Sequence, residues 1–175
     1  MGHFDENLIS LDEILKLSKI QGYALECLKR ECVDILDTGS NPYPELDLEN
    51  ATIGDVYERF DQYKQEIEYN AMPILLAGIE AVVRLDYQHK RRKAGRFRSL
   101  YSTEGSRARL EDIIEAWKMF LPHERELFGK YKDALSLRNW LAHGRYFPQD
   151  LGRHEYSIEY LFDIGQRVKR ILDNS

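Results

Sequence analysis

Apolar residues recur every three to four positions along most of the chain, with polar residues between them, which is the pattern of amphipathic helices. The first such run covers residues 11–39. Ser10 and Glu13 stand at its start with the spacing of a capping box, and Gly39 supplies the residue type that commonly ends a helix. No segment shows sustained two-residue alternation, so we predict no strand.

A second run begins near Thr52 and continues to Pro73, which we expect to break or kink the helix because proline lacks the backbone donor. Residues 74–93 form a third run that is apolar on nearly every side, as in a helix at the centre of a bundle. Glu80 and Arg84 lie one turn apart within it. Since a buried charge is costly unless it is paired, these two residues predict either a structural ion pair or a charged pair that faces the motif described below.

Three further helical runs follow, over residues 106–121, from about residue 124 or 130 to residue 143, and over about 155–172, and Pro122 closes the first of them. Loops of moderate length join the runs. The chain is therefore predicted to be all-α, a single-domain helical bundle of about five to six helices that spans residues 1–175.

Composition is that of an ordinary globular domain, with 175 residues, 43% hydrophobic and 31% charged. The longest apolar runs are too short to cross a membrane, and the first residues lack the basic start and apolar stretch of a signal peptide. Cys27 and Cys32 do not form a CxxC pair, and the five histidines lack zinc-ligand spacing. We therefore expect a cytoplasmic protein with free thiols, no metal and no membrane contact.

Charge is unevenly distributed along the chain. Residues 1–80 carry 6 Lys/Arg against 17 Asp/Glu, whereas residues 81–175 carry 19 against 13. An acidic first half followed by a basic second half indicates a polyanionic partner for the second half, or contact between halves or subunits. A solvated surface with chance asymmetry would give the same counts.

Basic residues are densest within residues 89–98, where six of ten positions are Lys or Arg. Glycine, serine and threonine follow as far as Gly105, so we expect a basic flexible loop over residues 89–105. Such clusters attract nucleic acid, and Phe97 and Tyr101 are placed to stack on unpaired bases. A solubilising turn is the alternative. The predicted RNA-binding residues are Lys90, Arg91, Arg92, Lys93, Arg96 and Arg98.

The most chemically suggestive stretch is Arg138-Asn139-Trp140-Leu141-Ala142-His143-Gly144. In a helix Asn139 and His143 share a face one turn apart, and glycine is a common helix stop. A histidine in the last turn can exchange a proton near neutral pH, while Arg138 offers a fixed positive fork for phosphate. Asn139 is placed to orient the imidazole. In the alternative reading, His143 only caps its helix.

This stretch resembles the HEPN superfamily, whose ribonuclease and toxin members, including those of the RiboL-PSP-HEPN type, carry arginine followed by four to six residues and histidine. Arg138, Asn139 and His143 match that motif, and Ala142 and Gly144 are also typical of it. Glu80 and Arg84 are similar to acidic and basic positions on an earlier helix of several such ribonucleases. The motif covers seven residues, and the helical pattern fits most of the chain.

The resemblance implies a metal-independent endoribonuclease without cofactor, from a toxin–antitoxin or phage-defence system. It also implies a homodimer with a composite site, an RNA substrate, and an antitoxin or regulatory protein as a further partner. Arg138, Asn139 and His143 would be catalytic, with Glu80 and Arg84 in support. Attack by the ribose 2′-OH would leave a 2′,3′-cyclic phosphate and a 5′-hydroxyl.

Two other readings stay open. Some HEPN domains have lost catalysis and bind RNA or nucleotides, so Arg138 and the basic segment would then grip the ligand without cleaving it. A helical protein-interaction module would instead dock residues 89–98 on an acidic partner. Steep salt dependence of RNA binding favours the first of these readings.

Overall fold

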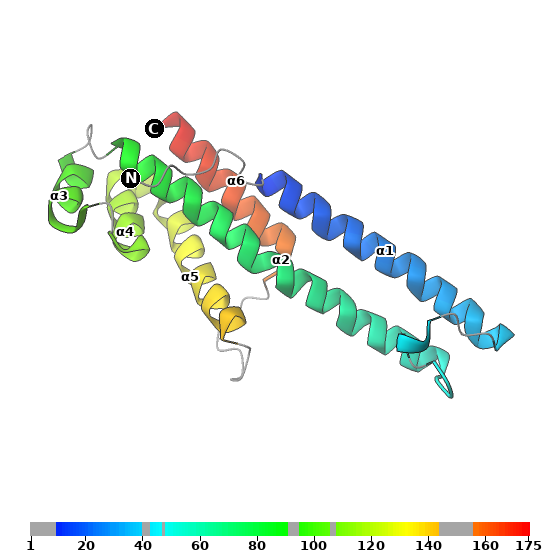
Figure 1. Cartoon of the computed structure of the whole chain (residues 1–175). Helices are drawn as coiled ribbons and strands as arrows, with labels where there is room; N and C mark the ends of the chain where they lie inside the picture. Colours follow the sequence, from blue (N-terminus) through cyan, green and yellow to red (C-terminus); the bar gives the residue numbers. More distant parts are fainter. Residues whose placement is uncertain (1–9, 40–42, 47, 91–94, 106–107, 144–155) are drawn as a thin grey trace. The chain divides into compact units, whose positions relative to one another are not determined.

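The computed structural model describes residues 10–39, 43–46, 48–90, 95–105, 108–143 and 156–175, and every regular element within these ranges is helical. The predicted all-α class is therefore confirmed. The elements are α1 (Leu11–Thr38), η1 (Pro44–Leu46), α2 (Ile53–Lys90), α3 (Gly95–Glu104), α4 (Leu110–Phe120), η3 (Pro122–Glu124), α5 (Arg125–Ala142) and α6 (Ile158–Asn174) (Figure 1).

The chain forms two compact units. One, which we call the hairpin unit, comprises residues 16–71. The other, which we call the main unit, comprises residues 1–15 and 72–175. Each of the two longest helices, α1 and α2, contributes residues to both units. The prediction of one domain over residues 1–175 stays a prediction.

The ends of α1 are those that its sequence predicts. The backbone N–H of Ser10 donates to Glu13 Oε2 at 2.9 Å, and the N–H of Glu13 donates to Ser10 Oγ at 3.2 Å, so the capping box is formed. Gly39 follows the last turn with φ of 72°, a conformation that side chains disfavour. Gly22 lies inside the helix without interrupting it.

Pro73 does not break α2, which runs without interruption from residue 53 to residue 90. The expectation of two separate helices here was wrong. A proline inside a helix costs about 3 kcal/mol. Met72, Leu75 and Leu76 beside it are fully buried, and each such side chain contributes about 1.5–3 kcal/mol. Burial therefore outweighs the lost backbone hydrogen bond.

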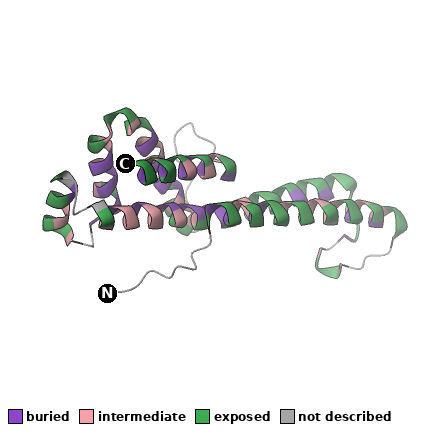
Figure 2. Cartoon of the chain, turned by 90° about the horizontal axis from the view of Figure 1, so that it is seen from above, coloured by how far each residue is buried: buried purple, intermediate pink, exposed green. Residues whose placement is uncertain are grey.

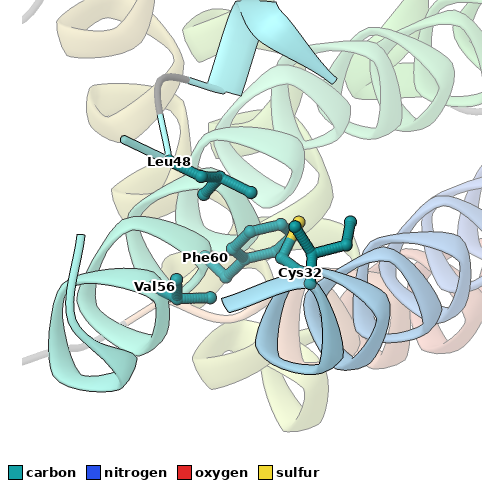
Figure 3. Packing of buried hydrophobic residues seen from close by; sticks show 5 residues of the cluster. Cys32, Leu48, Val56 and Phe60 are labelled. Carbon is teal, nitrogen blue, oxygen red and sulfur yellow. The ribbon is translucent and has the colours of Figure 1, made fainter. Parts of the chain in front are cut away.

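The hairpin unit has its own small core, built where α1 and α2 face each other. Cys32, Leu48, Val56 and Phe60 are buried in it together with Ile35. Figure 3 shows Leu48 and Cys32 next to the Phe60 ring. Leu48 comes from the connection between the helices, so its burial ties this part of the connection to the core of the hairpin unit.

The main unit is held by α3 packing on α4, α4 on α5, and α5 on α6. Its helices bury one side and expose the other, as the purple and green positions of Figure 2 show. Aromatic rings fill the α3–α5 side of the core. Trp117 of α4 stacks on Phe128 of α5 at 5.7 Å between ring centroids, and Phe97 of α3 lies 4.9 Å from Trp117.

Residues 95–104 form the helix α3 and not the flexible loop predicted for residues 89–105. Residues 91–94 lie outside the described part of the chain. Phe97 is fully buried among Trp117, Phe120 and Tyr87, so its ring is unavailable to a nucleic-acid base. Tyr101 is half-buried beside Tyr87. The serines and threonines that suggested a loop are instead compatible with a helix anchored by one aromatic side chain.

Two glycines bring three helices of the main unit into close contact. A Cβ on Gly165 of α6 would lie 2.8 Å from Ile79 Cγ1 and 3.1 Å from Leu11 Cδ1. A Cβ on Gly78 of α2 would lie 2.9 Å from Leu11 Cδ2. Ile79 and Leu11 are both buried, so neither can move aside cheaply.

Replacing Gly165 with alanine is therefore expected to lower the free energy of unfolding by about 1–3 kcal/mol through overpacking. Gly129 of α5 provides the matched control, because nothing lies within 4 Å of its added Cβ. There alanine should raise the stability by about 0.5–1 kcal/mol. Urea unfolding of both variants measures the difference, and equal effects would contradict this account of the packing.

Candidate functional site at the end of α5

The C-terminal end of α5 carries the predicted motif. Its buried side includes Phe128, Tyr131 and Ala134, and these residues fix the orientation of the helix in the main unit. Arg138 follows on the edge of that side, with its side chain 31% exposed. Asn139 and His143 are exposed. Burial of the preceding turns therefore sets where the motif's polar side chains point.

Glu80 is the central residue of a charged cluster that joins three parts of the main unit. Its Oε1 accepts a hydrogen bond from Arg84 Nε at 2.7 Å, and its Oε2 accepts one from Arg138 Nη1. Arg84 Nη1 also donates to the Ala108 carbonyl at 3.0 Å, just before α4. The predicted proximity of Glu80 and Arg84 to Arg138 is found, and we call Glu80, Arg84 and Arg138 the charged cluster.

Two guanidinium groups on one carboxylate alter its ionisation. Burial is the largest single influence and raises the pKa of Glu80, but the hydrogen bonds and charges of Arg84 and Arg138 together outweigh it. The pKa of Glu80 therefore lies below its ordinary value of 4.5. Glu80 stays negative at any pH near neutral, and the cluster carries a net positive charge.

Acidification should weaken the fold through Glu80. A carboxylate whose pKa is lower in the folded state contributes stability above its unfolded-state value, here 4.5, and loses it as the pH falls toward the folded-state value. The difference in melting temperature between wild type and Glu80→Gln should therefore be largest near neutral pH and should shrink below pH 4.5.

Glu126 provides the control for that pH series. It pairs with Lys130 at 2.7 Å, but its side chain is 82% exposed, so solvent screens the interaction. Glu126→Gln should differ little from wild type at any pH. A difference for Glu80→Gln that stays constant from pH 7 to pH 3 would show that its carboxylate does not stabilise the fold through its charge.

His143 is the C-cap residue of α5. Its backbone N–H donates to the Asn139 carbonyl at 3.1 Å, with φ of −89° and ψ of 15°, so the residue closes the last turn. The imidazole is exposed. Gly144, predicted as the helix stop, lies outside the described residues.

Arg138 and His143 leave α5 in different directions. Five residues separate them, which turns their side chains about 140° apart around the helix. The side chains of Asn139 and His143, four residues apart, point only about 40° apart around the helix. Within one copy of the chain, Arg138 thus faces α2 while Asn139 and His143 face outward.

Tyr131 belongs to the same region although its sequence position had not suggested a role. Its hydroxyl is fully buried and has no hydrogen-bond partner among the described residues. Burial, and next the negative charge of Glu80, raise the pKa of this hydroxyl far above its ordinary range, while Arg138 and Arg84 act in the opposite direction. The only sequence signal is that Tyr131 precedes Arg138 by seven residues, which places both on one face of α5.

The predicted RNA-binding residues are only partly described. Arg91, Arg92 and Lys93 lie outside the described residues. Lys90 ends α2 and Arg96 lies in α3, but their side chains also fall outside what the structure describes. Arg98 is exposed on α3. Their role in RNA binding stays a prediction.

No protein-family model, curated protein or solved structure matches the chain. None of the described helices is long and apolar enough to span a membrane. Within the same residues no group of three or more His, Cys, Asp or Glu side chains is arranged to hold a metal ion.

Proposed function

We propose that this protein is a metal-independent endoribonuclease of the HEPN type, acting in a defence or toxin–antitoxin setting. The observation that carries the proposal is the exposed imidazole of His143 at the C-terminal end of α5, five residues after Arg138, whose guanidinium Glu80 holds in place. An imidazole supplies proton transfer, and a fixed guanidinium supplies positive charge for a phosphate. These are the two things that cleavage of RNA without metal requires.

The chemistry uses the nucleophile that RNA itself carries. A base removes the proton from a ribose 2′-OH, which attacks the adjacent phosphorus. The P–O5′ bond breaks, and an acid protonates the departing oxygen, leaving a 2′,3′-cyclic phosphate and a 5′-hydroxyl. His143 is the group for proton transfer, and Arg138 stabilises charge on the phosphorane-like transition state. Asn139 orients the imidazole or a phosphate oxygen.

A second copy of the chain would complete this site. The reaction needs both a base and an acid, whereas His143 is the one imidazole that the described part of the chain presents at the end of α5. Two-fold symmetry would supply the second imidazole and bring a second Arg138 to the same phosphate. The directions of Arg138 and His143 around α5 fit a site that is shared between subunits. RNA is the proposed substrate, and an antitoxin or regulatory protein a further partner.

A substrate comparison tests the proposal. Single-stranded RNA and the same sequence with 2′-O-methyl ribose at every position are incubated with the purified protein. The methylated strand retains phosphates and bases but lacks the nucleophile, so we expect it to bind and stay intact while the RNA is cut. Cleavage of the methylated strand would rule out the proposed mechanism.

A non-catalytic RNA- or nucleotide-binding module is the second candidate. It is favoured by the engagement of Arg138 with Glu80, because a guanidinium already paired to a carboxylate offers less charge to a transition state. In that case RNA binds with a steep dependence on salt and remains uncut. The two candidates therefore separate in the same experiment.

A further inference from the structure

The charged cluster presents a difficulty for the proposed function. Arg138 must reach a phosphate, yet its guanidinium donates to Glu80. Releasing Arg138 would leave Glu80 Oε2 without that donor in a site where Glu80 is only 21% exposed. An unsatisfied carboxylate oxygen at this depth costs more than a neutral group would. A second donor from the protein would lower the cost of moving Arg138.

Tyr131 has the donor that such a movement requires. Its hydroxyl is buried and finds no acceptor among the described residues, so a hydrogen bond remains to be made there. Tyr131 and Arg138 lie on one face of α5, two turns apart. Helical side chains lean toward the N-terminus of their helix, so the Arg138 side chain and the carboxylate bound to it lie on the side of Tyr131.

We infer that Tyr131 is a positioning residue, whose hydroxyl takes over as hydrogen-bond donor to Glu80 when Arg138 turns to a phosphate. In the free protein Arg138 donates to Glu80, and the Tyr131 hydroxyl makes no hydrogen bond to the described residues. In the complex Arg138 binds the phosphate, and Tyr131 donates to the oxygen that Arg138 has left. Arg84 stays on the other carboxylate oxygen throughout. No proton is transferred, so Glu80 remains ionised in both states.

This inference rests on the proposed function for its ligand, but its core is a coupling between Tyr131 and Arg138 that needs no RNA. Arg138→Met removes the guanidinium and keeps the apolar stem, so it mimics the released state. Melting temperatures are then measured for Tyr131→Phe in the wild-type and Arg138→Met backgrounds. Together with the two parents, the four proteins form a double-mutant cycle.

In the wild-type background Tyr131→Phe should leave the melting temperature unchanged or raise it, because it removes a buried polar group that makes no bond. In the Arg138→Met background it should lower the melting temperature by about 3–10 °C, because it removes the donor to Glu80. An equal effect in the two backgrounds would overturn the inference.

Tyr87→Phe is the matched control. The Tyr87 hydroxyl is also in the main unit, but it already donates to the Gly105 carbonyl at 3.2 Å. Its removal should lower the melting temperature by the same amount in both backgrounds. A background-dependent effect at Tyr87 as well would mean that Arg138→Met loosens the whole unit, which would also count against a specific role for Tyr131.

A binding measurement connects the coupling to the ligand. The 2′-O-methyl strand should bind Tyr131→Phe about 3–10-fold more weakly than wild type, because Arg138 is then harder to release. The NMR signal of the ring carbon bonded to the Tyr131 hydroxyl can be assigned because this signal is missing from the spectrum of Tyr131→Phe. It should shift when the strand is added to wild type. An unmoved signal with unchanged affinity would overturn the inference.

The two proposals fail in different ways. Coupling in the double-mutant cycle without cleavage of RNA would contradict the proposed ribonuclease and leave the Tyr131–Glu80 exchange standing. Cleavage of RNA without coupling would contradict only the exchange.

Discussion

Replacing His143 with alanine is expected to lower the rate of RNA cleavage by about 10²–10⁴-fold, the usual contribution of a positioned general acid or base. The melting temperature should hardly change, because the His143 side chain is exposed. Single-turnover cleavage of a short RNA measures the chemical step without interference from product release. A loss of rate without a loss of stability would assign His143 to the reaction and not to the fold.

His123 is the matched control for this experiment. It is an exposed histidine on η3, outside the candidate site, and His123→Ala should cleave RNA at the wild-type rate. All three proteins are purified in the same way, so a contaminating ribonuclease would give equal activity in each preparation. Equal cleavage by wild type and His143→Ala would remove His143 from the mechanism.

Replacing Arg138 with alanine is expected to lower the cleavage rate by about 10²–10³-fold, as does the loss of one preorganised charge donor in other enzymes. Arg138→Lys should restore little of this rate. Lysine is a point charge on a flexible chain and cannot present the planar fork that suits both a carboxylate and a phosphate. The decrease should appear mainly in kcat, because the charge develops in the transition state.

Arg125, exposed at the start of the same helix, provides the control for Arg138. Arg125→Ala removes the same charge from α5 and should leave kcat unchanged. If Arg138→Ala raised only KM, Arg138 would bind RNA without stabilising the transition state. That outcome would favour the binding module over the ribonuclease.

Much of the helical architecture can be read from the sequence because local signals and burial agree there. The capping box of Ser10 and Glu13, the stop at Gly39, and the end of α4 just before Pro122 each follow from a residue type at one position. Pro73 and residues 95–104 were misjudged for a shared reason. In both places the local signal opposed a helix, whereas the burial of apolar side chains within the segment stabilised one.

The α2 helix also shows that a hydrophobic pattern does not give the extent of burial. Its second half is apolar on nearly every side, which predicted burial all round. In the structure Met72, Leu76 and Val83 are buried, whereas Ile74 is 54% exposed. A sequence gives the apolar surface of a helix but not how much of it the rest of the chain covers.

The sequence was enough to predict which residues make up the candidate site, but only some of the contacts between them. The spacing of Glu80 and Arg84 predicts an ion pair, and their contact with Arg138 was one of two readings of that pair. The idle hydroxyl of Tyr131 could not be foreseen, since a tyrosine at helical spacing is usually only a core residue. Its unmet hydrogen bond is visible only once the surrounding side chains are in place.

The most direct measurement is the chemistry of the cut ends. Wild type and His143→Ala are incubated with single-stranded RNA in EDTA, and the products are analysed by mass spectrometry. If the imidazole of His143 and the guanidinium of Arg138 cleave RNA, wild type will give 2′,3′-cyclic phosphate and 5′-hydroxyl ends, and His143→Ala will give almost none. Cleavage that appears only after magnesium is added, or that leaves 5′-phosphate ends, would contradict the account.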